Sequence, residues 1–455
     1  MSAPPTRRLR PDLPPGPFLV VGLARSGQAA ARLLAARGEA VRGVDSGSPQ
    51  GAGRLSEAGV EVFLESDGLA LLEGTRTVVK SPGVPREAPV IAAALERGID
   101  VVGELELAWR ALPNRFVAVT GTNGKTTTVE LLGHVYRGAG EPVAVAGNVG
   151  TPLSELVGQV EPDATVICEA SSFQLEDTSF FAPECAVFLN LAPDHLDRHG
   201  DLESYLAAKL RIFANQGNDD VAVFNADDPE LAGIDLGGCA RRLAFCAGPG
   251  PDCEVALAEG TIFYDGEPLL AVEELGLFGE HNVHNAMAAA AAALAMGLDR
   301  EAVREGLRGF AGVPHRLEQI AEIGGVRFVN DSKATNVASA VVGIRAFESG
   351  VHLILGGSEK DEPFAPLLDP VRERCAAVYL TGATAERLAT ELAPAAAAGI
   401  ALHRCDGLED AIGRAAAAAA PGEVVLLAPA CASFDAFENF ERRGERFREI
   451  VEGLR

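Results

Sequence analysis

Three segments of the chain follow one pattern, in which an apolar run leads into a glycine-rich turn and then into a helical stretch. The runs are 18–22, 115–120 and 351–355, and the turns that follow read LARSG, GTNGK and GGSEKD. Apolar strands that alternate with helices are typical of parallel β-sheets, because two parallel strands need a crossover, usually a helix. At roughly 150 residues per domain, the 455 residues fit three domains, one for each segment.

The second turn, TGTNGKTTT at 120–128, carries the strongest chemical signal. Backbone N–H groups of a glycine-rich turn and the N-terminus of the next helix together favour phosphate. Lys125 can then reach the β- and γ-phosphates of a nucleotide, and the hydroxyl of Thr126 or Thr127 can bind Mg²⁺. Val119 replaces the first glycine of the general P-loop, so the loop is a variant. It predicts a nucleotide site, with a plain tight turn as the alternative.

The first turn, VVGLARSG at 20–27, is a weaker match to a dinucleotide-binding turn, because Ala24 stands where that pattern has glycine. Asp45 ends the next strand about 20 residues on, where contact with a ribose or base is expected. We predict a phosphate-bearing ligand here, with a structural turn as the alternative. Lys80, in VVKSPGV, follows another strand and precedes a turn that could face the same cleft.

Two breaks separate the three segments. The helix-like ELELAWRAL ends before Pro113, and GFAGVP at 309–314 follows an alanine-rich region. We expect domains at 1–112, 113–314 and 315–455. The expected class is α/β, each domain a mostly parallel sheet flanked by helices: Rossmann-like in the first and third, P-loop ATPase-like in the centre. The alanine-rich stretch 388–420 is expected to be helical.

The composition excludes several kinds of partner. The chain has 39 basic and 64 acidic residues, and its net charge of −25 disfavours binding to nucleic acid or anionic lipid. No apolar run is long enough to span a membrane. The first ~15 residues are expected to form a proline-rich tail without the apolar core of an export signal. The eight cysteines form no CxxC pair and are expected to be reduced thiols of a cytoplasmic protein.

Lysine is rare in this chain. Five of the 39 basic residues are lysine, namely Lys80, Lys125, Lys209, Lys333 and Lys360, and the others are arginine. A lysine amine is a compact charge and, when neutral, a nucleophile that can be modified, whereas a guanidinium stays charged. Each lysine is therefore a candidate functional residue, although a chance scatter would give the same count.

Three more polar residues of the central segment are candidates for metal or phosphate chemistry. Glu169 ends a strand expected at 165–168, and a carboxylate at a strand end beside a P-loop suits Mg²⁺. His195 follows a strand expected at 186–191, and Lys209 lies on an expected helix. Each has a structural alternative: a solvated strand end, a structural histidine and a solvated helix lysine.

The remaining candidates lie farther along the chain. Asn282 and Asn285 are three apart on one helix face, which suits an adenine edge or, alternatively, helix capping. In the last segment, PHRLE contributes two polar residues, NDSKATN follows a strand, and GGSEKD forms a turn after a strand, where turn chemistry is the alternative. These residues are His315, Arg316, Asp331, Lys333, Thr335 and Lys360.

In their order along the chain, these motifs resemble those of the Mur ligase family, ATP-dependent amino-acid ligases of peptidoglycan synthesis. The resemblance covers nearly the whole chain, through TGTNGKTTT, CEASSFQLE, DHLDRH, AAKLRIF, HNVHN, PHRLE, NDSKATN, GGSEKD and PACASFDAFENFERRG. The last motif and VNDSKATN most resemble the D-glutamate-adding branch. The resemblance implies a ligase that adds D-glutamate to UDP-N-acetylmuramoyl-L-alanine through an acyl phosphate. Such a role serves cytoplasmic cell-wall synthesis, and through it cell shape, division and the cell cycle.

The resemblance also implies a role for each site residue. The catalytic residues would be Lys125, His195 and Lys209. The ATP site would comprise Gly121, Thr122, Asn123, Gly124, Lys125, Thr126, Thr127, Asn282, Asn285, Arg316 and Asp331. Two Mg²⁺ ions would be held by Thr126, Glu169, His195 and a carbamylated Lys209. The sugar substrate would be bound by Arg25, Ser26, Asp45, Ser81, Gly83, Asn148, Ser171 and His195. The D-glutamate site would comprise Lys333, Thr335, Lys360, Ser433 and Phe440.

Other functions stay open at this point. A sibling ligase, such as another Mur ligase or a folylpolyglutamate synthetase, would share the logic of the ATP site. A nicotinamide dehydrogenase built on the first turn is disfavoured by Ala24, and a nucleotide-dependent binding protein by the presence of the candidate catalytic residues. We expect no flavin or nicotinamide, no nucleic-acid partner, no insertion into a membrane, and a monomer.

Overall fold

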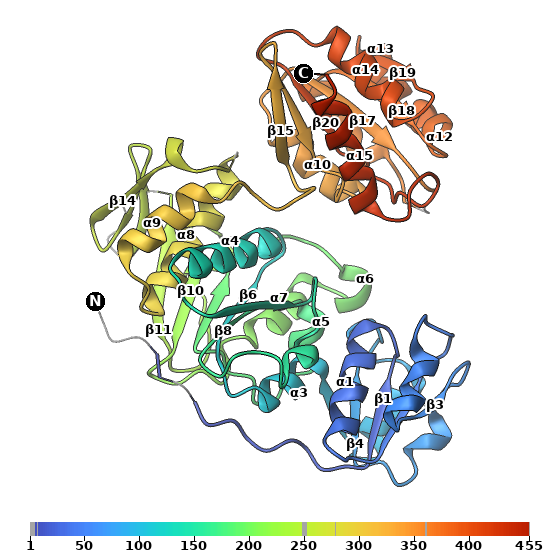
Figure 1. Ribbon diagram of the computed structural model, residues 1–455, viewed down its shortest axis with the longest axis vertical. Coiled ribbons are helices and arrows are strands. Elements are labelled where there is room, and N and C mark those ends of the chain that lie inside the picture. Colours follow the sequence, from blue (N-terminus) through green and yellow to red (C-terminus); the bar gives the residue numbers. More distant parts are fainter. Residues whose placement is uncertain (1–4, 7, 248–252, 278, 360–361, 455) are drawn as a thin grey trace. The chain divides into compact units, whose positions relative to one another are not determined.

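The computed structural model describes residues 5–6, 8–247, 253–277, 279–359 and 362–454, which build three β-sheets flanked by helices (Figure 1). Residues 1–275 and 281–310 belong to one compact unit, and residues 276–280 and 311–455 belong to a second. The first two sheets belong to the first unit and the third sheet to the second. The expected α/β class with mostly parallel sheets is confirmed, and the predicted domain limits at 112 and 314 stay predictions.

The first sheet has the strand order β3-β2-β1-β4-β5, with every pair parallel. Its strands are β1 (Phe18–Val21), β2 (Val41–Val44), β3 (Glu61–Phe63), β4 (Thr77–Lys80) and β5 (Asp100–Gly103), and its helices α1 (Arg25–Ala36), α2 (Pro89–Glu96) and α3 (Glu104–Ala111). Alternate residues of β1 enter two separate hydrophobic clusters. The strand is buried on both faces, which explains its uninterrupted apolar sequence.

The second sheet has nine strands in the order β14-β13-β12-β11-β10-β9-β6-β8-β7, and its last hairpins, β12 to β14, are antiparallel. Its strands are β6 (Arg115–Thr120), β7 (Val143–Gly147), β8 (Thr165–Glu169), β9 (Cys185–Phe188), β10 (Val221–Asn225), β11 (Arg241–Cys246), β12 (Val255–Ala258), β13 (Thr261–Tyr264) and β14 (Glu267–Ala271). Its helices are α4 (Lys125–Gly138), α5 (Ser172–Leu175), α6 (Leu196–His199), α7 (Leu202–Leu210), α8 (Glu280–Ala295) and α9 (Arg300–Gly309). The alanine run of α8 is buried on all sides, as expected for a helix that is apolar all round.

The third sheet has the order β15-β16-β20-β17-β18-β19, with only β15 and β16 antiparallel among its pairs. Its strands are β15 (Glu318–Ile323), β16 (Val326–Asn330), β17 (Val351–Gly356), β18 (Cys375–Thr381), β19 (Ala401–Arg404) and β20 (Val424–Leu427). Its helices are α10 (Val337–Arg345), α11 (Leu368–Arg374), α12 (Ala385–Glu391), α13 (Ala393–Ala397), α14 (Leu408–Ala418) and α15 (Phe440–Glu452).

Three sequence-based expectations are wrong in detail. The stretch 388–420 contains the edge strand β19 between helices, because its residues pair with β18. The strand expected at 186–191 ends at Phe188, since the chain turns there to hydrogen-bond with the loop after β6. Cys246 and Cys253 are joined in a disulfide, because β11 and β12 bring their Cα atoms to 6.1 Å.

The segment expected to be a proline-rich tail runs along the first unit and contacts it (Figure 1). The Arg10 guanidinium lies 4.4 Å from the centre of the Trp109 ring and donates to Glu184 Oε1 at 3.0 Å. Farther along, the Pro15 carbonyl accepts from Thr77 Oγ1 at 2.8 Å. The segment therefore contacts both the second and the first sheet.

A buried ion pair also links these two sheets. Lys80, at the end of β4, is fully buried, and its Nζ lies 2.7 Å from Asp177 Oδ2, just after α5. The same amine donates to the Val84 carbonyl at 2.9 Å. Burial raises the pKa of Asp177, and the Lys80 charge opposes that rise. The one lysine outside the family motifs therefore ties the turn after β4 to the central sheet.

Removing only one partner of this pair should destabilise the protein. We expect Lys80→Met to lower the free energy of unfolding by about 3 kcal/mol, because it leaves a buried carboxyl group without its partner. The double variant Lys80→Met/Asp177→Leu should recover most of that loss. Urea unfolding followed by the fluorescence of Trp109, the single tryptophan of the chain, measures this. Additive losses in the double variant would contradict the pairing.

Candidate active site

The loop between β6 and α4 has the backbone shape of a phosphate-binding turn. Gly121 and Gly124 adopt φ values of 152° and 83°, which disfavour any side chain. A Cβ atom at Gly124 would lie 2.2 Å from Asn285 Oδ1, so this position also lacks room for one. The α4 helix begins at Lys125, which directs its N-terminal N–H groups towards the loop.

The polar side chains of this loop meet a carboxylate from the neighbouring strand. Thr126 Oγ1 donates to Glu169 Oε2 at 2.9 Å, and Asn148 Nδ2 donates to Glu169 Oε1 at 3.0 Å. Glu169 ends β8, which pairs with β6, and it is 3 % exposed. Lys125 Nζ donates to the carbonyls of Gly121 and Thr122, both at 2.8 Å. The expected grouping of Thr126 and Glu169 is therefore present.

Lys209 reaches the same loop from α7. Its side chain is 1 % exposed, and its Nζ donates to the Gly121 carbonyl at 2.8 Å and lies 4.4 Å from the centre of the Tyr205 ring. Burial, with a further contribution from the Lys125 charge, lowers the pKa of Lys209 to about 6. At neutral pH this amine is largely uncharged. The sequence marked Lys209 as a candidate through the rarity of lysine, but it could not predict this protonation state.

His195 lies at the border of this group. Its backbone has a φ of 53°, and its side chain is half exposed. The ring centre lies 5.0 Å from that of Phe173 and 6.5 Å from that of Tyr205. His195 and Lys209 thus share Tyr205 as a neighbour. The sequence analysis missed Tyr205 and Phe173. Their only signal was their position in the sequence: Phe173 lies within CEASSFQLE, and Tyr205 lies between DHLDRH and AAKLRIF.

Two expected ligand-binding groups have partners within the protein. Ser171 caps α5: its hydroxyl accepts from the backbone N–H of Gln174 at 3.3 Å. Asn285 Nδ2 donates to Asn282 Oδ1 at 3.0 Å, and both amides are buried on α8. Asn285 also faces Gly124, so α8 lies directly against the phosphate loop.

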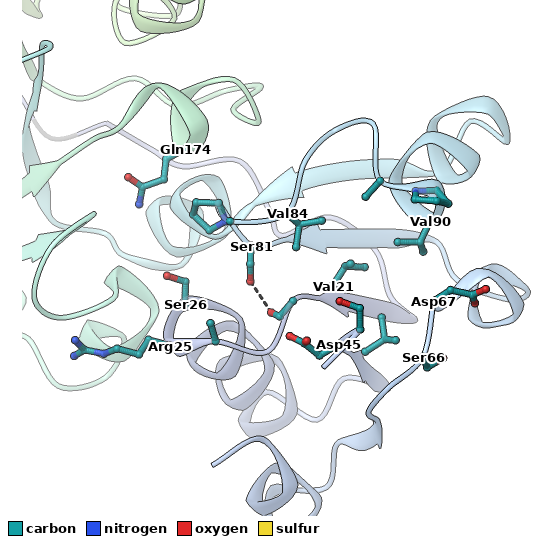
Figure 2. Close-up of a pocket in the computed structure, with 18 of the residues that line it drawn as sticks. Val21, Arg25, Ser26, Asp45, Ser66, Asp67, Ser81, Val84, Val90 and Gln174 are labelled. Atoms are coloured by element: carbon teal, nitrogen blue, oxygen red, sulfur yellow. Dashed lines mark hydrogen bonds between the residues drawn. The ribbon is translucent and has the colours of Figure 1, made fainter. Parts of the chain in front are cut away.

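A pocket of about 690 Å³ opens at the carboxyl ends of the strands of the first sheet (Figure 2). Six of the eight residues expected to bind the sugar substrate line it, namely Arg25, Ser26, Asp45, Ser81, Gly83 and Asn148, whereas Ser171 and His195 do not. Ser46, Ser66, Asp67 and Gln174 line it as well and were not expected. Figure 2 shows Gln174, which lies on α5, facing the pocket across from Ser26 at the start of α1.

The loops of this pocket are fixed by their own hydrogen bonds. Asp45 Oδ2 accepts from the backbone N–H of Leu23 at 2.6 Å, and its Oδ1 from that of Gly47 at 2.8 Å. Ser81 Oγ donates to the Gly22 carbonyl at 2.6 Å (Figure 2). Asn148 lines the pocket and also donates to Glu169, so the pocket borders the phosphate loop.

The residues predicted in the last segment belong to the second unit. Burial raises the pKa of Asp331 to about 7, and Arg316 opposes the rise. Lys333 Nζ lies 5.9 Å from the centre of the Phe440 ring. Ser433 is 2 % exposed, and its Oγ has no hydrogen-bond partner among the described residues. Thr335 follows Lys333 in the same loop, and Lys360 lies outside the described residues.

The donor set near the phosphate loop suits Mg²⁺ in company with a nucleotide. Within the described part of the chain, three or more His, Cys, Asp or Glu side chains nowhere gather as a metal cluster. Mg²⁺ usually takes one or two carboxylates together with substrate phosphates and water. The buried Glu169 carboxylate beside the Thr126 hydroxyl fits that requirement.

Among the described helices, none has the length and apolar character to cross a membrane.

Comparison with known proteins covers almost the whole chain. Residues 17–103, 119–293 and 315–431 match, in that order, families described as Mur ligase MurD-like N-terminal domain, Mur ligase middle domain, and Mur ligase glutamate ligase domain. A UDP-N-acetylmuramoylalanine–D-glutamate ligase of Acidobacterium capsulatum is 43 % identical over 95 % of both chains. One of Pelotomaculum thermopropionicum is 42 % identical over 96 % of this chain and 97 % of its own.

Solved structures share the fold at lower identity. A UDP-N-acetylmuramate–alanine ligase of Thermotoga maritima superposes with a TM-score of 0.58 at 19 % identity, covering 96 % of this chain and 99 % of its own. FolC of E. coli, in complex with DHPP and ADP, superposes with a TM-score of 0.54 at 21 % identity. This match covers 77 % of this chain and 92 % of the FolC chain. The three family matches and the likeness to the Thermotoga maritima structure together show the three-domain architecture.

The lowered pKa of Lys209 can be measured directly. In the metal-free protein with ¹³C-labelled lysine, we expect one of the five lysine signals to titrate near pH 6. Lys125→Met should raise that pKa, because it removes a neighbouring positive charge. The measurement is a ¹³C NMR titration, with Lys209→Arg identifying the signal. Titration of all five amines near their usual value of about 10.4 would contradict the burial of a neutral amine.

Proposed function

The chain belongs to the Mur ligase family, and from that premise we propose that it is an ATP-dependent ligase that joins D-glutamate to UDP-N-acetylmuramoyl-L-alanine. Relatives that carry this name match it at about 40 % identity over nearly their full length. The observation that carries the proposal is the bond from Asn148 to Glu169. Through it, a pocket suited to a nucleotide sugar borders a loop suited to a triphosphate.

The reaction needs ATP because a carboxylate is a poor acyl donor. The carboxylate oxygen of the terminal L-alanine attacks the γ-phosphorus, and ADP leaves as an acyl phosphate forms. The D-glutamate amine then attacks the acyl carbon, gives up a proton, and inorganic phosphate leaves as the amide forms. Both steps concentrate negative charge, so positioned donors and cations provide most of the catalysis.

The first unit supplies the donors for phosphoryl transfer. We assign the ATP phosphates to the loop from Gly121 to Thr127, where the Lys125 ammonium stabilises charge on the transferred group. Arg25 and Ser26, at the N-terminus of α1, suit the diphosphate of the sugar substrate. Asp45, Ser81 and Gly83, which line the pocket, are assigned to its uridine, and Asn148 is assigned to the reacting carboxyl group. Ser171, whose hydroxyl caps α5, is assigned to the sugar substrate because it belongs to the CEASSFQLE motif.

We assign one Mg²⁺ ion to Thr126 and Glu169, and a second to His195 and a carbamylated Lys209. When bound, Mg²⁺ neutralises charge on the phosphate oxygens. The Lys209 amine is buried and contacts the phosphate loop. Its neutral nitrogen can add to CO₂ and release a proton, which converts an uncharged amine into an anionic carbamate. Arginine could not replace it, because a guanidinium does not become a free nucleophile at neutral pH.

The remaining assignments involve the second unit. Asn282, Asn285, Arg316 and Asp331 are assigned to the adenosine and phosphates of ATP. D-Glutamate is assigned to Lys333, Thr335, Lys360, Ser433 and Phe440. The buried Ser433 hydroxyl, which lacks a partner among the described residues, is a donor available to a substrate carboxylate. A cytoplasmic location, a monomeric state and the absence of flavin or nicotinamide stay predictions.

The proposed activity can be tested by phosphate release. With Mg²⁺, ATP and UDP-N-acetylmuramoyl-L-alanine, the protein should release phosphate with D-glutamate, and far less with L-glutamate, diaminopimelate or a folate acceptor. A Lys125→Ala variant should lose about a hundredfold or more of the rate, because it removes charge at the transferred phosphoryl group. Equal turnover with a folate acceptor would favour the sibling ligase instead.

Carbamylation makes a separate prediction. We expect Lys209→Ala to lose most of its turnover and to regain part of it with formate or acetate, whose carboxylate can take the place of the carbamate. Lys209→Arg, which keeps a charge but offers no carboxylate, serves as the control and should not respond to either acid. Full activity of Lys209→Ala without added acid would exclude the assigned role.

A further inference from the structure

Arg443 lies in the last of the quoted motifs, PACASFDAFENFERRG, but none of the assigned sites gives it a role. It lies on α15, is 4 % exposed, and points its guanidinium into the loops at the end of the third sheet. Nε donates to Ser332 Oγ at 3.0 Å, and Nη2 donates to the carbonyls of Ser332 and Cys431 at 2.9 and 3.0 Å. Nη1 donates to the Ala432 carbonyl at 3.3 Å.

The same guanidinium also packs against a third loop. A Cβ atom at Gly357 would lie 3.1 Å from Arg443 Nη1, so Gly357 leaves room for this contact. Ser332, Cys431 and Gly357 follow the ends of β16, β20 and β17, which are neighbours in the sheet. Arg443 therefore hydrogen-bonds to two adjacent loops, after β16 and β20, and lies beside a third, after β17.

These three loops carry the residues assigned to D-glutamate. Lys333 and Thr335 follow Ser332, and Ser433 follows Ala432. In the sequence, Lys360 comes three residues after Gly357, outside the described residues. Phe440 begins the helix that carries Arg443, and its carbonyl accepts from Ser332 Oγ at 2.8 Å. One side chain thus connects every segment of that site.

Chemistry explains why an arginine occupies this position. Its partners are three carbonyl oxygens and one hydroxyl, and no carboxylate of the described residues forms an ion pair with it. Burial lowers the pKa of Arg443 to about 10, which leaves it charged at neutral pH. A planar fork of five N–H donors can satisfy acceptors from several directions at once, whereas a lysine ammonium offers three from one point.

We propose that Arg443 is a positioning residue of the amino-acid site, which holds the loops after β16, β17 and β20 at the spacing that D-glutamate requires. This inference rests on the proposed ligase function. Arg443 itself contacts loop backbone and the Ser332 hydroxyl, and it acts on the substrate through the neighbours of those groups.

Kinetics with each substrate varied in turn tests this role. We expect Arg443→Met to raise KM for D-glutamate at least about tenfold, since displaced loops misplace several contacts at once. KM for ATP and for the sugar substrate should change less than about twofold. The KM of Arg443→Lys for D-glutamate should lie between that of Arg443→Met and that of the unchanged protein. Arg442→Met, from the exposed neighbouring position on α15, is the matched control and should behave like the unchanged protein.

The outcomes separate this inference from the function on which it depends. If the unchanged protein shows no ATP consumption that depends on D-glutamate, the proposed function fails. If it is active but Arg443→Met raises all three KM values alike, or lowers kcat with all three KM values unchanged, the positioning role is overturned. Should Arg443→Met fold poorly, Arg443→Lys decides: an unchanged KM for D-glutamate in that variant overturns the role.

Discussion

The first unit depends on one buried carboxylate. Glu169 ends the strand beside the phosphate loop and accepts one hydrogen bond from Thr126, at the start of α4, and one from Asn148, in the wall of the pocket. A buried carboxylate is costly unless it is fully hydrogen-bonded or paired with a cation. The two hydrogen bonds satisfy it in part, and we assign its remaining lone pairs to a metal. The same group therefore couples a structural requirement to a catalytic one.

The five lysines illustrate how much the sequence could predict. Their rarity marked each as a candidate, and motif positions assigned four of them. The fifth, Lys80, forms a buried ion pair with Asp177, a partner almost a hundred residues away that no local pattern could indicate. The uncharged state of Lys209 likewise depends on burial by distant segments. Residue type and spacing thus identified the lysines that were candidates for a functional role. The ion-pair partner of Lys80 and the protonation state of Lys209 depend instead on tertiary packing.

The same distinction applies to the fold and the rest of the site. Strands followed by glycine turns were predictable, because each turn imposes local backbone requirements. The strand β19 was not, since its pairing with β18 overrides the helical preference of alanine. All six pocket residues that were predicted follow strand ends or turns. Gln174, Tyr205 and Arg443 were missed, because each reaches its site from a helix packed against the loops, and a single sequence does not encode that contact visibly.

A chain with a net charge of −25 must attract anionic substrates by local means. Cations exposed on the surface would be weak and screened by salt. Instead, Lys125 lies on its own loop carbonyls, Arg443 is buried among backbone oxygens, and helix N-termini meet the phosphate loop and the pocket. Positive potential that is fixed and buried acts over a short range and at full strength where water is excluded. An acidic surface and an anion-binding site can thus exist in one protein, because the repulsion from surface charges is screened by salt, whereas the attraction of the fixed positive groups acts at short range within the site.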